Sequence, residues 1–336
     1  MTNVLCFGEL LLRFSPQIGG VWLQKNQMPV FVGGAELNVA TALSHWEMPV
    51  QYCTTLPPNY LSQELITSIR NRGINADKIF LSGKRIGSYY LPQGADMQNA
   101  GVLYDRAHSA FSELKPGQID WDVMLDGIDW FNLSAISPAL NQNVADVCVE
   151  GMKAARSKNI MVSLDLNHRP RLWNWGRTPA EVMPALVEQC DLLMGNIWAA
   201  ATMLGIELQP NLKDDKDAYL EQATTTSQSV LQQFPNCKTV ANTFRFDRAN
   251  GLRYYAALYN ARGLVVSEDY QTKNVIDRVG SGDTFMAGLI YSHSKGLSAK
   301  RIIDFAATAA FNKLFITGDS TTNTVEDIEK AIADHV

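Results

Sequence analysis

Asp277-Arg278-Val279-Gly280-Ser281-Gly282-Asp283-Thr284-Phe285-Met286-Ala287-Gly288 is the stretch near the C-terminus of this 336-residue chain that decides the fold. Its first two glycines let the backbone turn and approach a ligand closely. The apolar residues that follow have helical spacing, so residues 280–283 lie at a helix N-terminus. Unpaired N–H groups and the helix dipole favour an anion there. We therefore expect the N–H groups of Gly280, Ser281, Gly282 and Asp283 to form an anion-binding loop.

The loop belongs to neither of two common phosphate-binding classes. No Gly-Lys-Ser/Thr follows the glycines, which excludes a Walker A loop. The position late in the chain, rather than after the first strand, excludes a dinucleotide fingerprint. A carboxylate beside an anion site needs a chemical task, and accepting a proton from an attacking hydroxyl fits Asp283. The alternative is that Asp283 only caps the helix. We expect the helix N-terminus to keep Asp283 ionised, as a weak base.

Composition narrows the function classes. Hydrophobic residues make up 46% and charged residues 19% of the chain, and its net charge is −5. These values are typical of a globular protein and lack the electrostatic footprint of a general nucleic-acid binder. The five cysteines form no CxxC pair, so we expect reduced, buried thiols. No basic segment precedes the first apolar run, and no apolar run is long enough to span a bilayer. We expect a cytoplasmic protein with no membrane or nucleic-acid partner.

Alternating strand and helix patterns predict a mostly parallel sheet covered by helices on both faces. Residues 4–7 form a buried apolar run, and a helical pattern begins at about residue 33. Further apolar runs lie at 129–133, 160–164, 191–194 and 239–241, with helical patterns at 141–157 and 179–189. Residues 254–258 and 263–267 predict a hairpin, and helices are expected near 283–295, 299–314 and 325–334.

Two other stretches predict short strands. Residues 11–32 and 85–106 hold small apolar pieces that alternate with polar residues or are punctuated by Pro and Gly. We expect the two stretches to pair into one small sheet set apart from the main body. Its exposed edges favour pairing with a second copy of the chain, so a homodimer through this sheet is a further hypothesis.

Two motifs together resemble the signatures of the ribokinase-like (PfkB) carbohydrate kinases. They are Gly33-Gly34-Ala35-Glu36-Leu37-Asn38-Val39-Ala40 and Gly280-Ser281-Gly282-Asp283-Thr284-Phe285. The strand–helix order between them also fits, so the resemblance covers essentially the whole chain. It implies one α/β domain over residues 1–336, with a three-layer α/β/α fold, a mostly parallel central sheet and a small β-sheet lid. The lid strands would lie at about 11–32 and 85–106.

Within that family the sequence is most similar to 2-keto-3-deoxygluconate kinases. The similarity lies in Gly87-Ser88-Tyr89-Tyr90, Tyr104-Asp105-Arg106-Ala107-His108-Ser109-Ala110 and Asp165-Leu166-Asn167-His168-Arg169-Pro170-Arg171-Leu172-Trp173. It implies a kinase that transfers the γ-phosphoryl group of ATP to a primary hydroxyl of a sugar acid. Such a kinase would use Gly34, Asn38, Tyr90, Tyr104, Arg106 and Arg169 to bind the sugar acid.

The chemistry of these side chains agrees with a sugar-acid ligand. Arginine stays charged and binds a carboxylate bidentately. Neighbouring strand residues face opposite sides, so only one of Tyr89 and Tyr90 can face the ligand, and we expect Tyr90. For Arg106 the alternative is a surface ion pair with Asp105 or Glu113.

The resemblance also implies groups that bind the nucleotide. ATP with Mg²⁺ would lie against Asn167, Arg169, Asn196, Arg245, Gly280, Gly282 and Asn312. Asp283 would accept the proton, while the loop N–H groups would hold the charge that grows on the phosphoryl oxygens. Asp277 is a candidate for a monovalent cation site behind the loop. No metal site built from protein ligands alone is predicted.

Two departures from the family pattern lie on the nucleotide side. The usual Asn-x-x-Glu is replaced by Asn196-Ile197-Trp198-Ala199, which has no carboxylate. The usual glycine turn after the strand at 239–241 is replaced by Asn242-Thr243-Phe244-Arg245-Phe246. Arg245 either contacts phosphate in place of backbone N–H groups or blocks ATP.

These departures leave alternatives open. One is a catalytically weak or inactive sensor that binds a sugar acid. Another is a kinase for fructose, ribose or a nucleoside. A dinucleotide oxidoreductase is disfavoured, because Gly8-Glu9-Leu10 after the first strand offers no GxGxxG.

Overall fold

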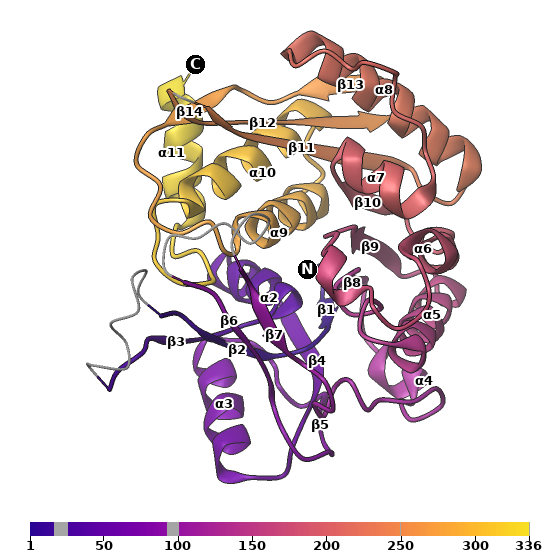
Figure 1. The fold of residues 1–336 in the computed structure, drawn as a ribbon, viewed down its shortest axis with the longest axis vertical. Helices are drawn as coiled ribbons and strands as arrows, with labels where there is room; N and C mark the ends of the chain where they lie inside the picture. The colour runs from indigo at the N-terminus through magenta and orange to yellow at the C-terminus, as the bar shows by residue number, and fades with distance from the viewer. Residues whose placement is uncertain (17–25, 93–100, 249, 336) are drawn as a thin grey trace.

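The computed structural model describes residues 1–16, 26–92, 101–248 and 250–335 (Figure 1). Its described part contains a ten-stranded sheet in the order β13-β12-β11-β10-β9-β8-β1-β4-β5, with β14 paired to β12. Neighbours from β11 to β5 pair in parallel, and β12 pairs antiparallel with β11, β13 and β14. The strands are β1 Val4–Phe7, β4 Val50–Leu56, β5 Ile79–Leu81, β8 Trp130–Ser134, β9 Met161–Asp165, β10 Leu192–Gly195, β11 Thr239–Arg248, β12 Gly251–Asn260, β13 Gly263–Val266 and β14 Tyr270–Thr272. The mostly parallel sheet and the late hairpin are thus confirmed.

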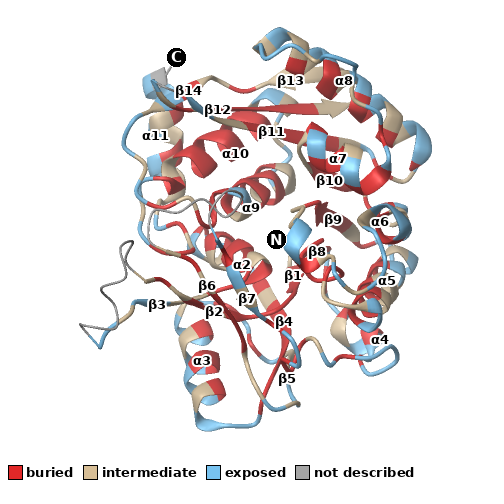
Figure 2. Ribbon diagram, viewed as in Figure 1, coloured by how far each residue is buried: buried red, intermediate tan, exposed pale blue. Residues whose placement is uncertain are grey.

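Helices cover both faces of this sheet (Figures 1 and 2). Strand β1 shows the layering, because Val4 and Cys6 pack into one hydrophobic cluster while Leu5 and Phe7 pack into another. All four residues are fully buried, as in a strand with helices on both sides. The helices are α2 Ala35–His45, α3 Tyr60–Asn71, α4 Trp121–Met124, α5 Gln142–Ser157, α6 Pro179–Val187, α7 Ile197–Leu204, α8 Lys216–Gln233, α9 Ser281–Ser294, α10 Ala299–Lys313 and α11 Val325–His335, with a short 3₁₀ turn at Pro170–Leu172. The expected three-layer α/β/α fold is confirmed.

A separate four-stranded sheet, called the lid sheet below, confirms the predicted pairing of the two short-strand stretches. Its order is β3-β2-β6-β7, with β2 Leu11–Phe14, β3 Val30–Gly33, β6 Gly87–Tyr90 and β7 Leu103–Asp105. The parts of those stretches at 17–25 and 93–100 lie outside the described residues. Val30 and Leu103 on its two edge strands are 49% and 58% exposed. The homodimer through this sheet stays a prediction.

Strand β11 is longer than the sequence pattern indicates. It continues from the expected 239–241 to Arg248, because residues 240–248 pair with β12 in one uninterrupted antiparallel ladder. The strand predicted at 239–241 is therefore too short, and residues 242–246, which replace the family's glycine turn, lie inside β11. The missing glycine has a simple reason, since an extended strand in this position needs no backbone turn.

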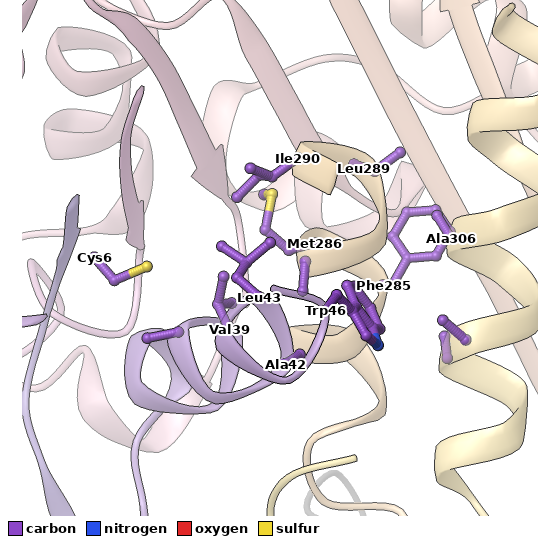
Figure 3. Close-up of a cluster of buried hydrophobic side chains, with 14 of the residues drawn as sticks. Cys6, Val39, Ala42, Leu43, Trp46, Phe285, Met286, Leu289, Ile290 and Ala306 are labelled. Carbon is purple, nitrogen blue, oxygen red and sulfur yellow. The ribbon is translucent and has the colours of Figure 1, made fainter. Parts of the chain in front are cut away.

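Close packing of α2, α9 and α10 forms the core nearest to the glycine loop. Val39 and Leu43 of α2, together with Trp46 directly after it, lie against Phe285, Met286 and Ile290 of α9 in one buried cluster (Figure 3). Gly288 lets α10 come close to α9, because a Cβ at this position would lie 2.6 Å from the Cα of Ala306. Backbone at this distance cannot move aside as a flexible side chain can.

The cysteine expectation agrees with the fold, since all five cysteines are buried and free of disulfides. Within the described residues no helix combines the length and the apolar character that a membrane span requires.

Substitution of Gly288 by valine tests the contact between α9 and α10. We expect Gly288→Val to lower the free energy of unfolding by about 1–3 kcal/mol, because the added side chain forces α9 and α10 apart. The matched control is Gly101→Val, since a Cβ at Gly101 would have no atom within 4 Å. Urea denaturation measures both. A Gly288→Val protein as stable as the control would contradict the proposed contact.

Candidate active site

A cavity of about 550 Å³ opens between the lid sheet and the carboxyl ends of the parallel strands. Ligands bind at this edge of open α/β sheets, and the volume lies in the usual range for a small-molecule site. Eleven of the predicted site residues line it, namely Gly34, Asn38, Tyr104, Asn167, Arg169, Asn196, Arg245, Gly280, Ser281, Gly282 and Asp283. The two glycine motifs, far apart in the sequence, therefore meet in one cavity.

The glycine loop begins helix α9 as expected. Gly280 is the residue before the helix and has a left-handed backbone with φ of 80°. A Cβ there would lie 1.8 Å from the carbonyl oxygen of Asp319, so only glycine fits. Asp283 is the third residue of the helix, and no side chain caps its N-terminus. The alternative of Asp283 as a simple helix cap is therefore wrong.

Asp283 is held by a residue of the other glycine motif. The Nδ2 of Asn38 donates to its Oδ2 at 2.7 Å. The pKa of Asp283 is raised to about 7, mainly by burial and in part by the nearby Asp165, although the Asn38 hydrogen bond and Arg169 act in the opposite direction. The expectation that the helix N-terminus keeps Asp283 fully ionised is wrong, because desolvation outweighs the dipole. A carboxyl group with this pKa is a stronger base than an ordinary aspartate.

The start of α2 is fixed by a buried carboxyl group. The Oε1 of Glu36 accepts hydrogen bonds from the backbone N–H of Ser134 at 2.9 Å and from the Oγ of Ser137 at 3.3 Å. Burial raises the pKa of Glu36 to about 8. Just before the helix, Gly34 has a φ of 129°, and a Cβ there would lie 2.2 Å from the carbonyl oxygen of Glu9. These contacts set where α2 begins and hence where Asn38 lies.

The end of strand β9 supplies a further carboxylate that the sequence did not single out. Asp165 lines the cavity, and burial raises its pKa to about 6. Its Oδ1 accepts from the backbone N–H of Asn167, which has a left-handed φ of 26°. The signal that could have found Asp165 is its place as the last residue of a buried strand, in the motif that also holds Asn167 and Arg169.

Of the neighbouring tyrosines Tyr89 and Tyr90 on lid strand β6, Tyr89 lines the cavity, whereas the sequence predicted Tyr90. Tyr89 lies on the cavity wall and is 5% exposed. Tyr90 stacks on Phe14 with ring centroids 5.1 Å apart, and it is absent from the described lining. The choice of Tyr90 is therefore corrected to Tyr89. Neighbouring residues of the strand do face opposite sides, as predicted. The side that faces the cavity carries Tyr89 and not Tyr90.

Arg106 is also absent from the described lining of the cavity. It is 3% exposed, and its Nε donates to the Oε2 of Glu9 at 2.6 Å. The alternative of a surface ion pair with Asp105 or Glu113 is wrong, because the buried Arg106 pairs with Glu9, and its contact with the sugar acid stays a prediction. The partner, Glu9, follows strand β1, a long-range neighbour that local sequence does not reveal.

Most of the residues predicted to contact the nucleotide line the cavity. The Oδ1 of Asn196 caps helix α7 by accepting from the backbone N–H of Ala199 at 2.8 Å. Arg245 and Arg278 line the cavity, and Arg278 forms an ion pair with Asp247 at 2.5 Å. Asn312, on α10, does not belong to the described lining, and its assignment to the nucleotide stays a prediction.

Known proteins share this fold and sequence over nearly the full chain. A 2-dehydro-3-deoxygluconokinase structure from Thermotoga maritima is 35% identical, with a TM-score of 0.89, and the match covers 99% of this chain and 100% of that one. A 2-dehydro-3-deoxygalactonokinase of Haloferax volcanii is 25% identical over 332 residues, which is 98% of this chain and 96% of the relative. Fructokinase-2 of Oryza sativa subsp. japonica is 25% identical over 296 residues, which is 87% of this chain and 80% of the relative.

The family model described as pfkB family carbohydrate kinase matches residues 1–326. Both glycine motifs that meet in the cavity lie within this range. The chain is therefore a carbohydrate kinase and belongs to the pfkB family.

Proposed function

We propose that this kinase transfers the γ-phosphoryl group of ATP to a primary hydroxyl of a sugar acid of the 2-keto-3-deoxygluconate class. The observation that carries the proposal is the position of the Asp283 carboxyl group. It accepts a hydrogen bond from Asn38 and lies beside the glycine loop in one cavity. This arrangement puts a base next to a set of N–H donors. A base and an anion site side by side are what phosphoryl transfer to a hydroxyl requires.

Asp283 takes the proton in the proposed reaction. The sugar oxygen attacks the γ-phosphorus, a new O–P bond forms, and the bond from the γ-phosphorus to the bridging oxygen of ADP breaks. The hydroxyl proton passes to Asp283. The N–H groups of Gly280, Ser281 and Gly282 stabilise the charge on the transferred phosphoryl oxygens.

Two buried guanidinium nitrogens support a polyphosphate ligand. The Nε atoms of Arg169 and Arg278 are buried without a hydrogen-bond partner among the described residues, and both side chains line the cavity. A buried donor without an acceptor is costly, and phosphate oxygens supply acceptors for it. We assign both arginines to the nucleotide phosphates or the sugar carboxylate.

The residues present also fit Mg²⁺. Proteins hold this ion through one or two carboxylates together with substrate phosphates, so a complete cage of side chains is not needed. Asp165 with Asn167 at the end of β9 is the group that would hold it, since the Asp165 carboxyl lines the cavity. Among the described residues no group of three or more His, Cys, Asp or Glu forms a metal site of its own. When bound, Mg²⁺ neutralises charge on the phosphate oxygens.

The relatives favour a sugar-acid substrate over fructose. The relative at 35% identity is named for 2-dehydro-3-deoxygluconate phosphorylation, and the one that covers 98% of the chain is named for the galactose counterpart. Fructose stays a second candidate because a fructokinase is also 25% identical. Membership in a kinase family disfavours the inactive sensor as an alternative.

A panel of sugars tests the substrate class. We expect ADP release from ATP to be fastest with 2-keto-3-deoxygluconate or 2-keto-3-deoxygalactonate, with fructose and ribose at least tenfold lower in kcat/KM, because arginines beside the sugar pair with its carboxylate. A coupled ADP assay at matched sugar concentrations measures the ratio. Faster turnover with fructose than with either acid would overturn the assignment.

Asparagine at position 283 tests the base. We expect Asp283→Asn to lower kcat by about 10²–10⁴-fold, the usual contribution of a general base, while ATP affinity stays within a few-fold. Asp122→Asn is the control, since that side chain is 85% exposed. Single-turnover kinetics and ATP titration measure the two effects. A kcat within threefold of the control would rule out Asp283 as the base.

The pH profile tests the raised pKa of Asp283. The base must be ionised, and its pKa is about 7, so we expect kcat/KM to rise with pH below 7 and to level off above it. The Asn38 hydrogen bond favours the ionised form, so Asn38→Leu should move the midpoint to higher pH. Initial rates between pH 5.5 and 9 measure both midpoints. A midpoint near 4, or a shift to lower pH in the variant, would contradict this account.

A further inference from the structure

A buried lysine lies directly behind the glycine loop. Lys313, the last residue of helix α10, is 0% exposed. Its Nζ donates to the carbonyl oxygen of Ile316 at 3.0 Å. Its Cε would lie 3.4 Å from a Cβ built on Gly280, and Lys313 does not belong to the described lining of the cavity. The ammonium group therefore backs the loop without reaching the ligand.

Two carboxylates and an arginine complete a buried group around this lysine, called the back cluster below (Arg13, Asp277, Lys313 and Asp319). Arg13 of lid strand β2 is 2% exposed, and its Nη2 lies 2.8 Å from Asp277 and 2.7 Å from Asp319. Its guanidinium also stacks over the ring of Phe31, 4.2 Å from the centroid. With two cations and two carboxylates the cluster is neutral overall.

The cluster is joined to the loop through backbone atoms. The Oδ1 of Asp277 accepts from the N–H of Val279 at 3.0 Å, and its Oδ2 accepts from the N–H of Gly318 at 3.2 Å. The carbonyl oxygen of Asp319 is the atom that leaves no room for a Cβ at Gly280. A change of charge in the cluster therefore acts on the loop at both its start and its back.

The burial of the Lys313 ammonium group requires an explanation, because removing a charged lysine side chain from water costs free energy. Burial lowers the pKa of Lys313, while Asp277 and Asp319 raise it. Arg13 already contacts both carboxylates at hydrogen-bond distance, whereas no ion pair within 4 Å joins Lys313 to either one among the described residues. The ammonium group of Lys313 therefore bonds to a carbonyl oxygen, that of Ile316, while the adjoining Cε lies behind Gly280.

We propose that Lys313 is a positioning residue for phosphoryl transfer, whose ammonium group supplies from within the chain the positive charge that a bound monovalent cation would otherwise place behind the glycine loop. The charge strengthens the field of the loop N–H groups at the phosphoryl oxygens, where the interior is poorly screened. This inference rests on the proposed phosphoryl transfer. It also replaces the cation site that the sequence placed beside Asp277.

The wild-type protein provides the first test. We expect its kcat with ATP and the best sugar of the panel to change less than twofold between buffers whose monovalent cation is tetramethylammonium, Na⁺, K⁺ or NH₄⁺ at equal ionic strength. Activation by K⁺ or NH₄⁺ of fivefold or more would overturn the inference and leave the kinase intact. No turnover with any sugar in any of these buffers would instead count against the proposed function.

Two variants test the charge itself. We expect Lys313→Ala and Lys313→Met to lower kcat about tenfold or more, with the KM for the sugar within threefold, since the charge acts mainly on the transition state. Alanine leaves space for a small cation, so 100 mM NH₄⁺ or K⁺ should restore Lys313→Ala at least fivefold and leave Lys313→Met unchanged. Lys153→Ala, at an exposed lysine of α5, is the control.

The outcomes separate an electrostatic role from a structural one. Thermal unfolding identifies variants that fold. A folded Lys313→Ala with full activity, or one that neither ion restores, would refute the inference, because a lysine needed only for packing gains nothing from NH₄⁺. Should both variants fail to fold, the cation dependence of the wild-type protein alone decides the question.

Discussion

The contact of 2.7 Å between Asn38 and Asp283 joins residues 245 positions apart in the sequence, and the rest of the site depends on it. Each residue lies in the first turns of a helix, and each helix begins at a glycine with positive φ. The two helices are held in register by the apolar core between α2 and α9 (Figure 3). Packing of two hydrophobic helix faces therefore sets the geometry of a polar pair at their ends.

Burial governs the protonation of Asp283. Taking a carboxylate out of water favours its neutral form, and only specific partners oppose that effect. Asp283, Asp165 and Glu36 all have raised pKa values, with desolvation as the leading cause in each. The cationic groups near them, Arg169 among others, offset only part of the effect. With a pKa of about 7, Asp283 can both bind and release a proton near neutral pH, as the base of the proposed reaction must.

The sequence predicted most of the scaffold, because strands and helices follow local patterns. The apolar run at 4–7 became β1 without a change of boundary, and the expected strand at 160–164 differs from β9 by one residue at each end. The predictions failed where contacts with residues distant in the sequence determine the local structure. Glu9 holds Arg106 outside the described lining of the cavity, and pairing with β12 extends β11 to Arg248, well past the strand predicted at 239–241. Lys313 gave no signal at all, since a lysine at the end of a helix is usually exposed.

The two departures from the family pattern, at residues 196–199 and 242–246, both change the charge of the cavity wall in the same direction. Ala199 stands where a carboxylate was expected, which removes a negative charge from this part of the cavity wall, and Arg245 adds a positive one. Both changes make that wall more attractive to a polyanion, so neither argues against nucleotide binding. Asp165, to which the proposal assigns Mg²⁺, ends β9, the strand next to β10 in the sheet. One substitution leaves out an acidic side chain and the other adds a basic one on this wall, a charge balance that suits the proposed binding of nucleotide phosphates.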